Sequence, residues 1–151
     1  MKKRKNVGYL VYNLYLAHQN TRWPMKKEKF LIEYVFHKAS RNSLWNHLTT
    51  TTGLSEWFAD DVTVKGNIYI FIWNKSPMEA ELLSMSPNNK VRFRWLEDEN
   101  ADSYFEFKLH TDEITGAVVL EVIDFAYPQE KEEAIALWDS QIKELKRTLG
   151  I

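Results

Sequence analysis

The sequence predicts an α+β fold in which a curved antiparallel sheet of about six to seven strands wraps around a long C-terminal helix, with two short helices after the first strand. Three observations predict it. Apolar residues alternate through a series of short segments, turn-forming residues separate those segments, and an amphipathic helical pattern closes the chain. A curved sheet and one long helix bury each other's apolar surfaces, so this order of elements describes one domain.

The first strand and the two short helices are expected soon after residue 25. From Phe30 to His37, aromatic and aliphatic residues on one side alternate with a mixed set on the other. Ser40 is a suitable N-cap for a first helix, and the run 49–53, four threonines and a glycine, is expected to end it. A second short helix is expected over 54–59, where apolar residues recur at helical spacing.

Six further strand segments follow, separated by short stretches that contain Gly, Pro, Asn or Asp. The expected segments are 62–64, 68–73, 78–85, 91–96, 104–110 and 117–125. Loops this short describe an antiparallel meander. Charged and aromatic residues alternate in 91–96 and 104–110. One face of the sheet is therefore expected to meet water and the other to be covered.

The covering element is expected between Pro128 and Gly150. Acidic residues occupy its first turn and basic residues its last, as the helix dipole favours. Apolar residues recur between them every three or four positions, at Ala134, Ile135, Trp138, Ile142, Leu145 and Leu149. This stripe predicts a helix with one face against the sheet.

The charge and cysteine content exclude several classes of function. The chain has a net charge of −1, but residues 1–24 carry five basic residues and no acidic one, so the remainder is net acidic. An acidic domain without a basic stripe is not suited to bind a phosphate backbone, and no nucleic-acid partner is expected. The absence of cysteine excludes disulfides and thiolate metal sites and fits a cytoplasmic location.

Residues 1–24 are interpreted as an N-terminal extension, either not native or disordered, ahead of a domain over 25–151. A basic start and the apolar run 7–17 give them a faint similarity to a signal peptide. The run is interrupted by Asn13 and is too short to span a bilayer, so no stable membrane insertion is expected. Met25 directly precedes the first good strand and resembles a natural start. A signal or anchoring segment is the alternative.

Two motifs, ASRNSLWNHLT over 39–49 and GLSEWFA over 53–59, resemble START-like (Bet v 1-like, SRPBCC) domains of the helix-grip fold. The resemblance is closest to the branch that includes the Hsp90-activator C-terminal domain. The pattern of that branch corresponds here to Leu44, Trp45, Leu48, Thr49, Leu54, Trp57 and Phe58. The chain departs from the branch at 65–67, Lys-Gly-Asn, where many members have a Gly-Gly pair. These are packing positions and indicate fold rather than chemistry.

The resemblance implies a cavity between the C-terminal helix and the concave sheet face, which members use for lipids, sterols or polyketides. We therefore expect a protein that is not an enzyme and that binds a small hydrophobic, lipid-like ligand without a cofactor. A protein-interaction module resembling Hsp90-activator domains and a cyclase- or hydratase-type enzyme are the alternatives. The residues expected to line the cavity are Tyr34, Phe36, Phe71, Trp73, Phe93, Trp95, Phe105, Phe107, Trp138, Ile142 and Leu145.

A catalytic site would need a polar group in that cavity with a shifted pKa. Tyr34, His47, Glu121 and Asp124 are the candidates. The patterns place His47 on the solvent side of its helix, Glu121 toward water, and Asp124 in a turn or cap. We therefore assign no catalytic residue.

No metal site is expected either, because the four histidines show no metal-ligand spacing; they are His18, His37, His47 and His110. The segment 68–73 is apolar on both faces, with isoleucines on one and aromatic residues on the other. The isoleucine face predicts a contact with another surface. A homodimer and cover by residues 7–17 are the two alternatives.

Overall fold

The computed structural model describes residues 26–151. The expectations for the extension 1–24, including cover of the sheet by residues 7–17, lie outside the described residues.

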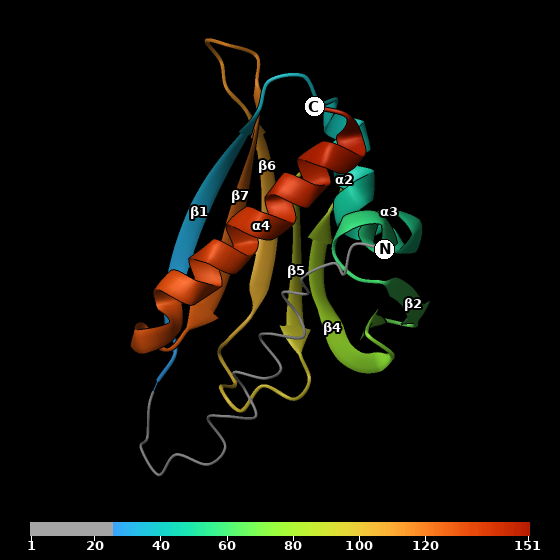
Figure 1. Cartoon of the computed structure of the whole chain (residues 1–151), viewed down its shortest axis with the longest axis vertical. Helices are drawn as coiled ribbons and strands as arrows, with labels where there is room; N and C mark the ends of the chain where they lie inside the picture. Colours follow the sequence, from blue (N-terminus) through green and yellow to red (C-terminus); the bar gives the residue numbers. More distant parts are fainter. Residues whose placement is uncertain (1–25) are drawn as a thin grey trace.

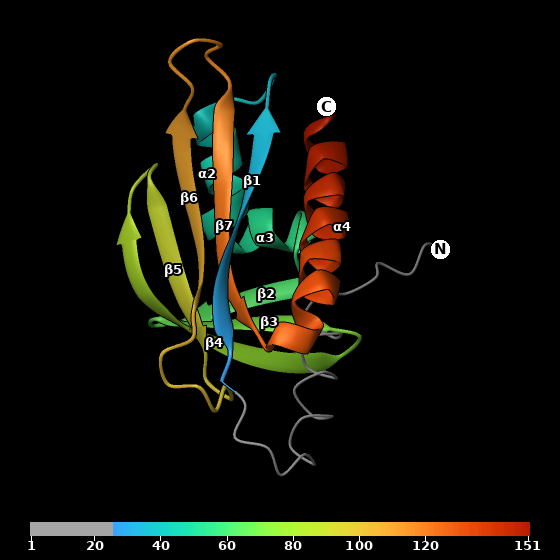
Figure 2. The ribbon, with the colours of Figure 1, turned by 90° about the vertical axis from the view of Figure 1, so that its left-hand side faces the viewer.

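Seven antiparallel strands form one curved sheet in the order β1-β7-β6-β5-β4-β3-β2. They are β1 (Glu28–Phe36), β2 (Asp61–Lys65), β3 (Ile68–Trp73), β4 (Ser76–Ser86), β5 (Lys90–Trp95), β6 (Phe105–Thr111) and β7 (Val118–Ala126). Strands β2 to β7 form the predicted meander, and β1 pairs with β7, so the first and last strands are neighbours. Figure 2 shows β2, β3 and β4 curving beneath the other strands.

Within residues 26–151, three helices and one 3₁₀ turn complete the predicted order. The helices α2 (Arg41–Thr49) and α3 (Thr51–Trp57) follow β1, and η1 (Pro128–Glu130) leads into α4 (Lys131–Leu149). Helix α4 crosses the concave face of the sheet diagonally (Figure 1). It ends at Gly150, whose left-handed backbone, with φ of 75°, terminates the helix as a glycine C-cap does. The fold class predicted from the sequence is confirmed.

The threonine run ends the first short helix, as predicted, but the second helix begins inside the run, at Thr51, three residues earlier than expected. Thr50 is both the C-cap of α2 and the N-cap of α3, and its hydroxyl accepts a hydrogen bond of 3.0 Å from the Gly53 amide. The second helix therefore starts within the run, because threonine at an N-cap satisfies a free amide. Gly53 itself lies where the two helices touch: a Cβ there would be 2.3 Å from the Asn46 carbonyl oxygen.

Strand pairing separates the sheet residues into two chemically different faces. On the concave face, Phe107 lies opposite Val122 and Phe93 opposite Phe105. On the convex face the partners include Arg92 and Glu106. A register shift between β4 and β5, at residues 82–84, marks a bulge that increases the bend of the sheet. The predicted covered and wet faces are thus the concave and convex faces.

The close approach of α2 and α3 makes Gly53 a stability determinant. Gly53→Ala is expected to lower the free energy of unfolding by about 1–3 kcal/mol, because the backbone of α2 must move to admit the methyl group. Thr52→Ala, one exposed position earlier in the same helix, is the matched control and should stay within about 0.5 kcal/mol of the wild type. Urea unfolding followed by circular dichroism measures both. Equal effects of the two substitutions would contradict this account.

Candidate functional site

The residues predicted to line a cavity come together in one apolar cluster between the concave face and α4. Nine of the eleven are buried, and Tyr34 and Trp95 keep partial exposure. Their rings contact one another directly: the centroids of Trp95 and Phe105 are 4.9 Å apart, and those of Phe93 and Phe105 are 5.1 Å apart. The sequence therefore placed these residues together, and their role in ligand binding stays a prediction.

Phe58 occupies the centre of this cluster. Its ring lies 5.0–6.3 Å, between centroids, from six aromatic rings, those of Trp57, Phe71, Trp73, Phe105, Phe107 and Trp138. Phe58 was expected as a motif residue of the second short helix and not as part of the concave site. It was missed because it follows α3 and belongs to no strand, so strand alternation does not assign it to a face.

The Phe58 carbonyl oxygen ties three elements together. It accepts hydrogen bonds from the Trp73 indole of β3 at 2.8 Å and from the Gln141 amide of α4 at 3.1 Å. Gln141 is buried, and this bond satisfies a side-chain group that would be costly to bury unpaired. The middle of α4 is thereby held against the end of α3.

The concave cluster is less completely covered toward its margins. Ile32 and Tyr34 on β1 and Ala134 and Ile135 at the start of α4 face the cluster and stay partly exposed. Trp95, on β5, does the same farther along the sheet. The interior is therefore filled at Phe58, and apolar side chains stay partly exposed at the margin between β1 and the start of α4.

Asp124 is an inward-facing residue, which corrects its assignment to a turn or cap. It lies within β7 opposite Phe30, and its carboxylate accepts a hydrogen bond of 2.9 Å from the Trp138 indole of α4. Burial raises the pKa of the Asp124 carboxyl from 3.8 to about 6, against the opposing hydrogen bonds from Trp138 and the Phe125 amide. An apolar surface thus holds a carboxyl group that takes up a proton at mildly acidic pH.

Two further polar contacts fasten α4 to β1. The Tyr34 hydroxyl donates to the Asp139 carboxylate at 2.7 Å, and the Lys146 ammonium donates to the Val35 carbonyl at 3.0 Å. Burial, and after it the neighbouring Asp139, raises the pKa of the Tyr34 phenol, so Tyr34 acts as a hydrogen-bond donor at physiological pH. The lysine covers a backbone acceptor of an edge strand, which protects that edge from pairing with another chain.

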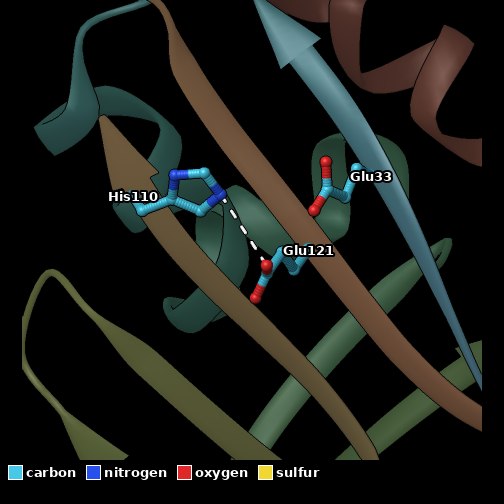
Figure 3. Close-up of side chains that lie close together, drawn as sticks. All are labelled: Glu33, His110 and Glu121. Carbon is cyan, nitrogen blue, oxygen red and sulfur yellow. Dashed lines mark ion pairs between the residues drawn. The ribbon is translucent and has the colours of Figure 1, made fainter. Parts of the chain in front are cut away.

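His47 and Glu121 do not belong to the concave site. His47 is partly buried between the two short helices, where Nε2 lies 2.8 Å from the Glu56 carboxylate and Nδ1 lies 2.7 Å from the Ser43 carbonyl. It is therefore engaged rather than simply solvent-facing, because α3 folds back beside α2. Glu121 is on the convex face as predicted, close to Glu33 and His110 (Figure 3).

The fold and the motifs agree with the comparison with known proteins. The model of the START-like superfamily domain matches residues 25–151. The chain belongs to the START-like superfamily. No curated protein matches it at a significant level. Among residues 26–151, no helix has the length and apolar character needed to cross a bilayer.

Solved structures with the same fold include a Bacteroides fragilis protein determined by NMR, which is 40% identical over 84% of this chain and 94% of its own, with a TM-score of 0.62. The Aha1 dimer from Colwellia psychrerythraea is similar at 16% identity, covering 79% of this chain and 94% of its own, with a TM-score of 0.64. CalU16 from Micromonospora echinospora is similar at 15% identity, covering 81% of this chain and 76% of its own, with a TM-score of 0.62. The last two likenesses indicate the fold alone.

Because Phe58 packs at the centre of the cluster, truncating its side chain is expected to lower the stability of the fold strongly. Phe58→Ala should lower the free energy of unfolding by about 3–5 kcal/mol, because six rings lose their common neighbour. Phe125→Ala is the control: Phe125 is only partly buried and its ring meets that of Tyr104, away from the cluster. Denaturant titration should show the larger loss for Phe58. An equal or larger loss at Phe125 would refute a central role for Phe58.

Asp124 predicts a pH dependence of stability. Because burial raises the pKa of Asp124 in the folded chain, the folded chain binds this proton more tightly than the unfolded chain. The contribution of Asp124 to the free energy of unfolding therefore falls as the pH rises from 3.8 to about 6, and it is constant above that range. Asp124→Asn keeps an acceptor for Trp138 but cannot ionise. Relative to the wild type, its free energy of unfolding should rise by about 2–3 kcal/mol between pH 4 and pH 7.

Asp112, whose pKa is lowered rather than raised in the folded chain, provides the control for that titration. Hydrogen bonds from Thr115 and Ile114 lower the pKa of Asp112, so Asp112→Asn should lose stability relative to the wild type as pH rises. Urea unfolding at four pH values distinguishes the two. A flat difference curve for Asp124→Asn would show that folding does not raise the pKa of Asp124.

Proposed function

We propose that this chain binds a small apolar, lipid-like molecule at the concave face, beside the N-terminal half of α4. The observation that supports the proposal best is the placement of Asp124. It lies on an inward-facing position of β7, opposite Phe30, and its carboxylate bonds to the Trp138 indole in a surface made mainly of aliphatic and aromatic side chains. Sites for small molecules combine such a surface with a few convergent polar groups.

The ligand would enter between β1 and α4 rather than at the centre of the sheet. Phe58 fills the centre, whereas Ile32, Tyr34 and Ile135 pack on the cluster and keep partial exposure. A hydroxyl or carboxyl group on the ligand would then lie near the hydrogen-bonding atoms of Asp124 and Tyr34. This arrangement suits an apolar molecule that carries one polar end.

The apolar contacts available at this margin are sufficient for useful affinity. Fully burying one aliphatic or aromatic side chain, or an equivalent part of a ligand, contributes about 1.5–3 kcal/mol. Micromolar binding corresponds to about 8 kcal/mol, so several such contacts reach it. The cysteine-free sequence supports a reducing compartment for this role, and we propose the cytoplasm.

Acid–base catalysis on the bound molecule is the second candidate, because Asp124 meets its main requirement. A general acid or base at neutral pH needs a pKa near the working pH, and burial raises that of Asp124 to about 6. Binding of the molecule without its chemical conversion would support the binding function alone. Conversion that is lost in Asp124→Asn while binding is retained would favour an enzyme.

A fluorescent fatty-acid probe tests the binding proposal with two neighbouring substitutions. Ile135 faces the apolar cluster, whereas Ala136, the next residue on α4, is exposed. Ile135→Asp should weaken probe binding at least about tenfold, the effect of losing one buried contact of about 1.4 kcal/mol, and Ala136→Asp should leave it unchanged. Circular dichroism confirms that each variant is folded. Equal probe affinities in all three proteins would contradict the proposed site.

Native mass spectrometry of the protein from its own host tests for the natural ligand. A reproducible additional mass of a few hundred daltons, absent from Ile135→Asp, is the expected result. A ligand-free mass, together with no binding of the fluorescent probe, would contradict the proposed binding of a small apolar molecule. A partner recovered by pull-down would then favour the interaction module.

A further inference from the structure

We propose that Glu33, His110 and Glu121 on the convex face form a binding site for a divalent transition-metal ion, with Zn²⁺ as the best-matched ion. This site lies on the opposite side of the sheet from α4 and is independent of the proposed ligand site. Its three residues come from β1, β6 and β7, which are neighbours in the sheet.

The register of the sheet fixes the relative positions of the three side chains. Glu33 is the direct cross-strand partner of Glu121. His110 pairs with Val119, two residues from Glu121 on the same face, so it is the diagonal neighbour of Glu121. Figure 3 shows the imidazole and both carboxylates on this face. One ligand atom from each residue lies within 4.8 Å of the others, and His110 Nε2 is 3.7 Å from Glu121 Oε1.

These distances are close to those of a loaded site. Zinc binds imidazole nitrogen and carboxylate oxygen at about 2.0–2.2 Å, which places neighbouring tetrahedral ligands about 3.3–3.5 Å apart. The His110–Glu121 pair at 3.7 Å is almost in place, and a separation of up to 4.8 Å closes by roughly 1.5 Å through side-chain rotation. The strands, unlike a loop, hold the Cα positions fixed while this occurs.

The two carboxylates of the cluster give it a negative charge that a bound cation would neutralise. Two glutamates directly opposite each other on a sheet repel, which destabilises the pair. Lys108 is the partner of Glu121 on its other side, yet among residues 26–151 it forms no ion pair. One divalent ion would neutralise both carboxylates while the histidine ligates in its neutral form.

The ligand types decide which ion fits. Imidazole with carboxylates suits zinc, nickel and cobalt, whereas magnesium and calcium take oxygen ligands. Glu33 is exposed and His110 and Glu121 are partly exposed, so water can occupy a fourth position. His47, in contrast, has both ring nitrogens within hydrogen-bond distance of other groups. Among residues 26–151, His110 is the histidine that lies close to two carboxylates.

Calorimetric titration of the untagged full chain with Zn²⁺ tests the proposal. We expect one bound ion per chain, not displaced by millimolar Mg²⁺. His110→Ala and Glu121→Gln should each weaken binding more than about tenfold, since even outer-shell substitutions cost 10–100-fold. His47→Ala, at a histidine of another element, should bind as the wild type does. Absence of binding, or an affinity unchanged by His110→Ala, overturns the proposal.

Thermal unfolding without and with Zn²⁺ provides a second readout. Glu121→Gln removes the repulsion with Glu33 and should raise the melting temperature of the metal-free protein. Zn²⁺ should raise the melting temperature of the wild type and not that of His110→Ala. A zinc-induced rise of the same size in both proteins would place the ion elsewhere in the chain and overturn the assignment.

Discussion

The position of Phe58 between the sheet and α4 is the constraint on which the rest of the structure depends. Its ring contacts six other rings, and its carbonyl oxygen binds Trp73 and Gln141. A curved sheet and a helix leave a space between them, and protein interiors are filled to the density of organic crystals. Phe58 fills that space from a third element. The same residue therefore holds α4 at its distance from the sheet.

The sequence predicted the order of elements because its two periodicities are unambiguous. Strand segments such as 68–73 alternate every second residue, and α4 repeats every three or four. The ends of elements were less predictable. Thr50 and Gly53 appeared to stop a helix, but threonine serves equally as an N-cap, and the need for glycine arises from contact with Asn46, which only the packing of the two helices creates.

The surroundings of the polar residues depend on contacts between distant segments. Asp124 faces inward because it pairs with Phe30 inside β7 rather than lying in a turn, and its partner Trp138 comes from α4. Glu33 and His110 are far apart along the chain and meet only because β1 pairs with β7 and β7 with β6. Strand alternation assigns a residue to a face. It does not say which residues of other strands lie beside it, because register is a property of the assembled sheet.

The pairing of β1 with β7 also has a consequence for how the chain is made. Partners in this pair are 82 residues apart at Phe36 and Val118 and 98 apart at Glu28 and Ala126. A ribosome releases the two strands at very different times, so β1 leaves the ribosome long before its partner exists. Such long-range pairing slows folding, because the intervening loop must close before the contact forms. The nascent chain therefore holds β1 without its partner strand until β7, the last strand of the sheet, has emerged.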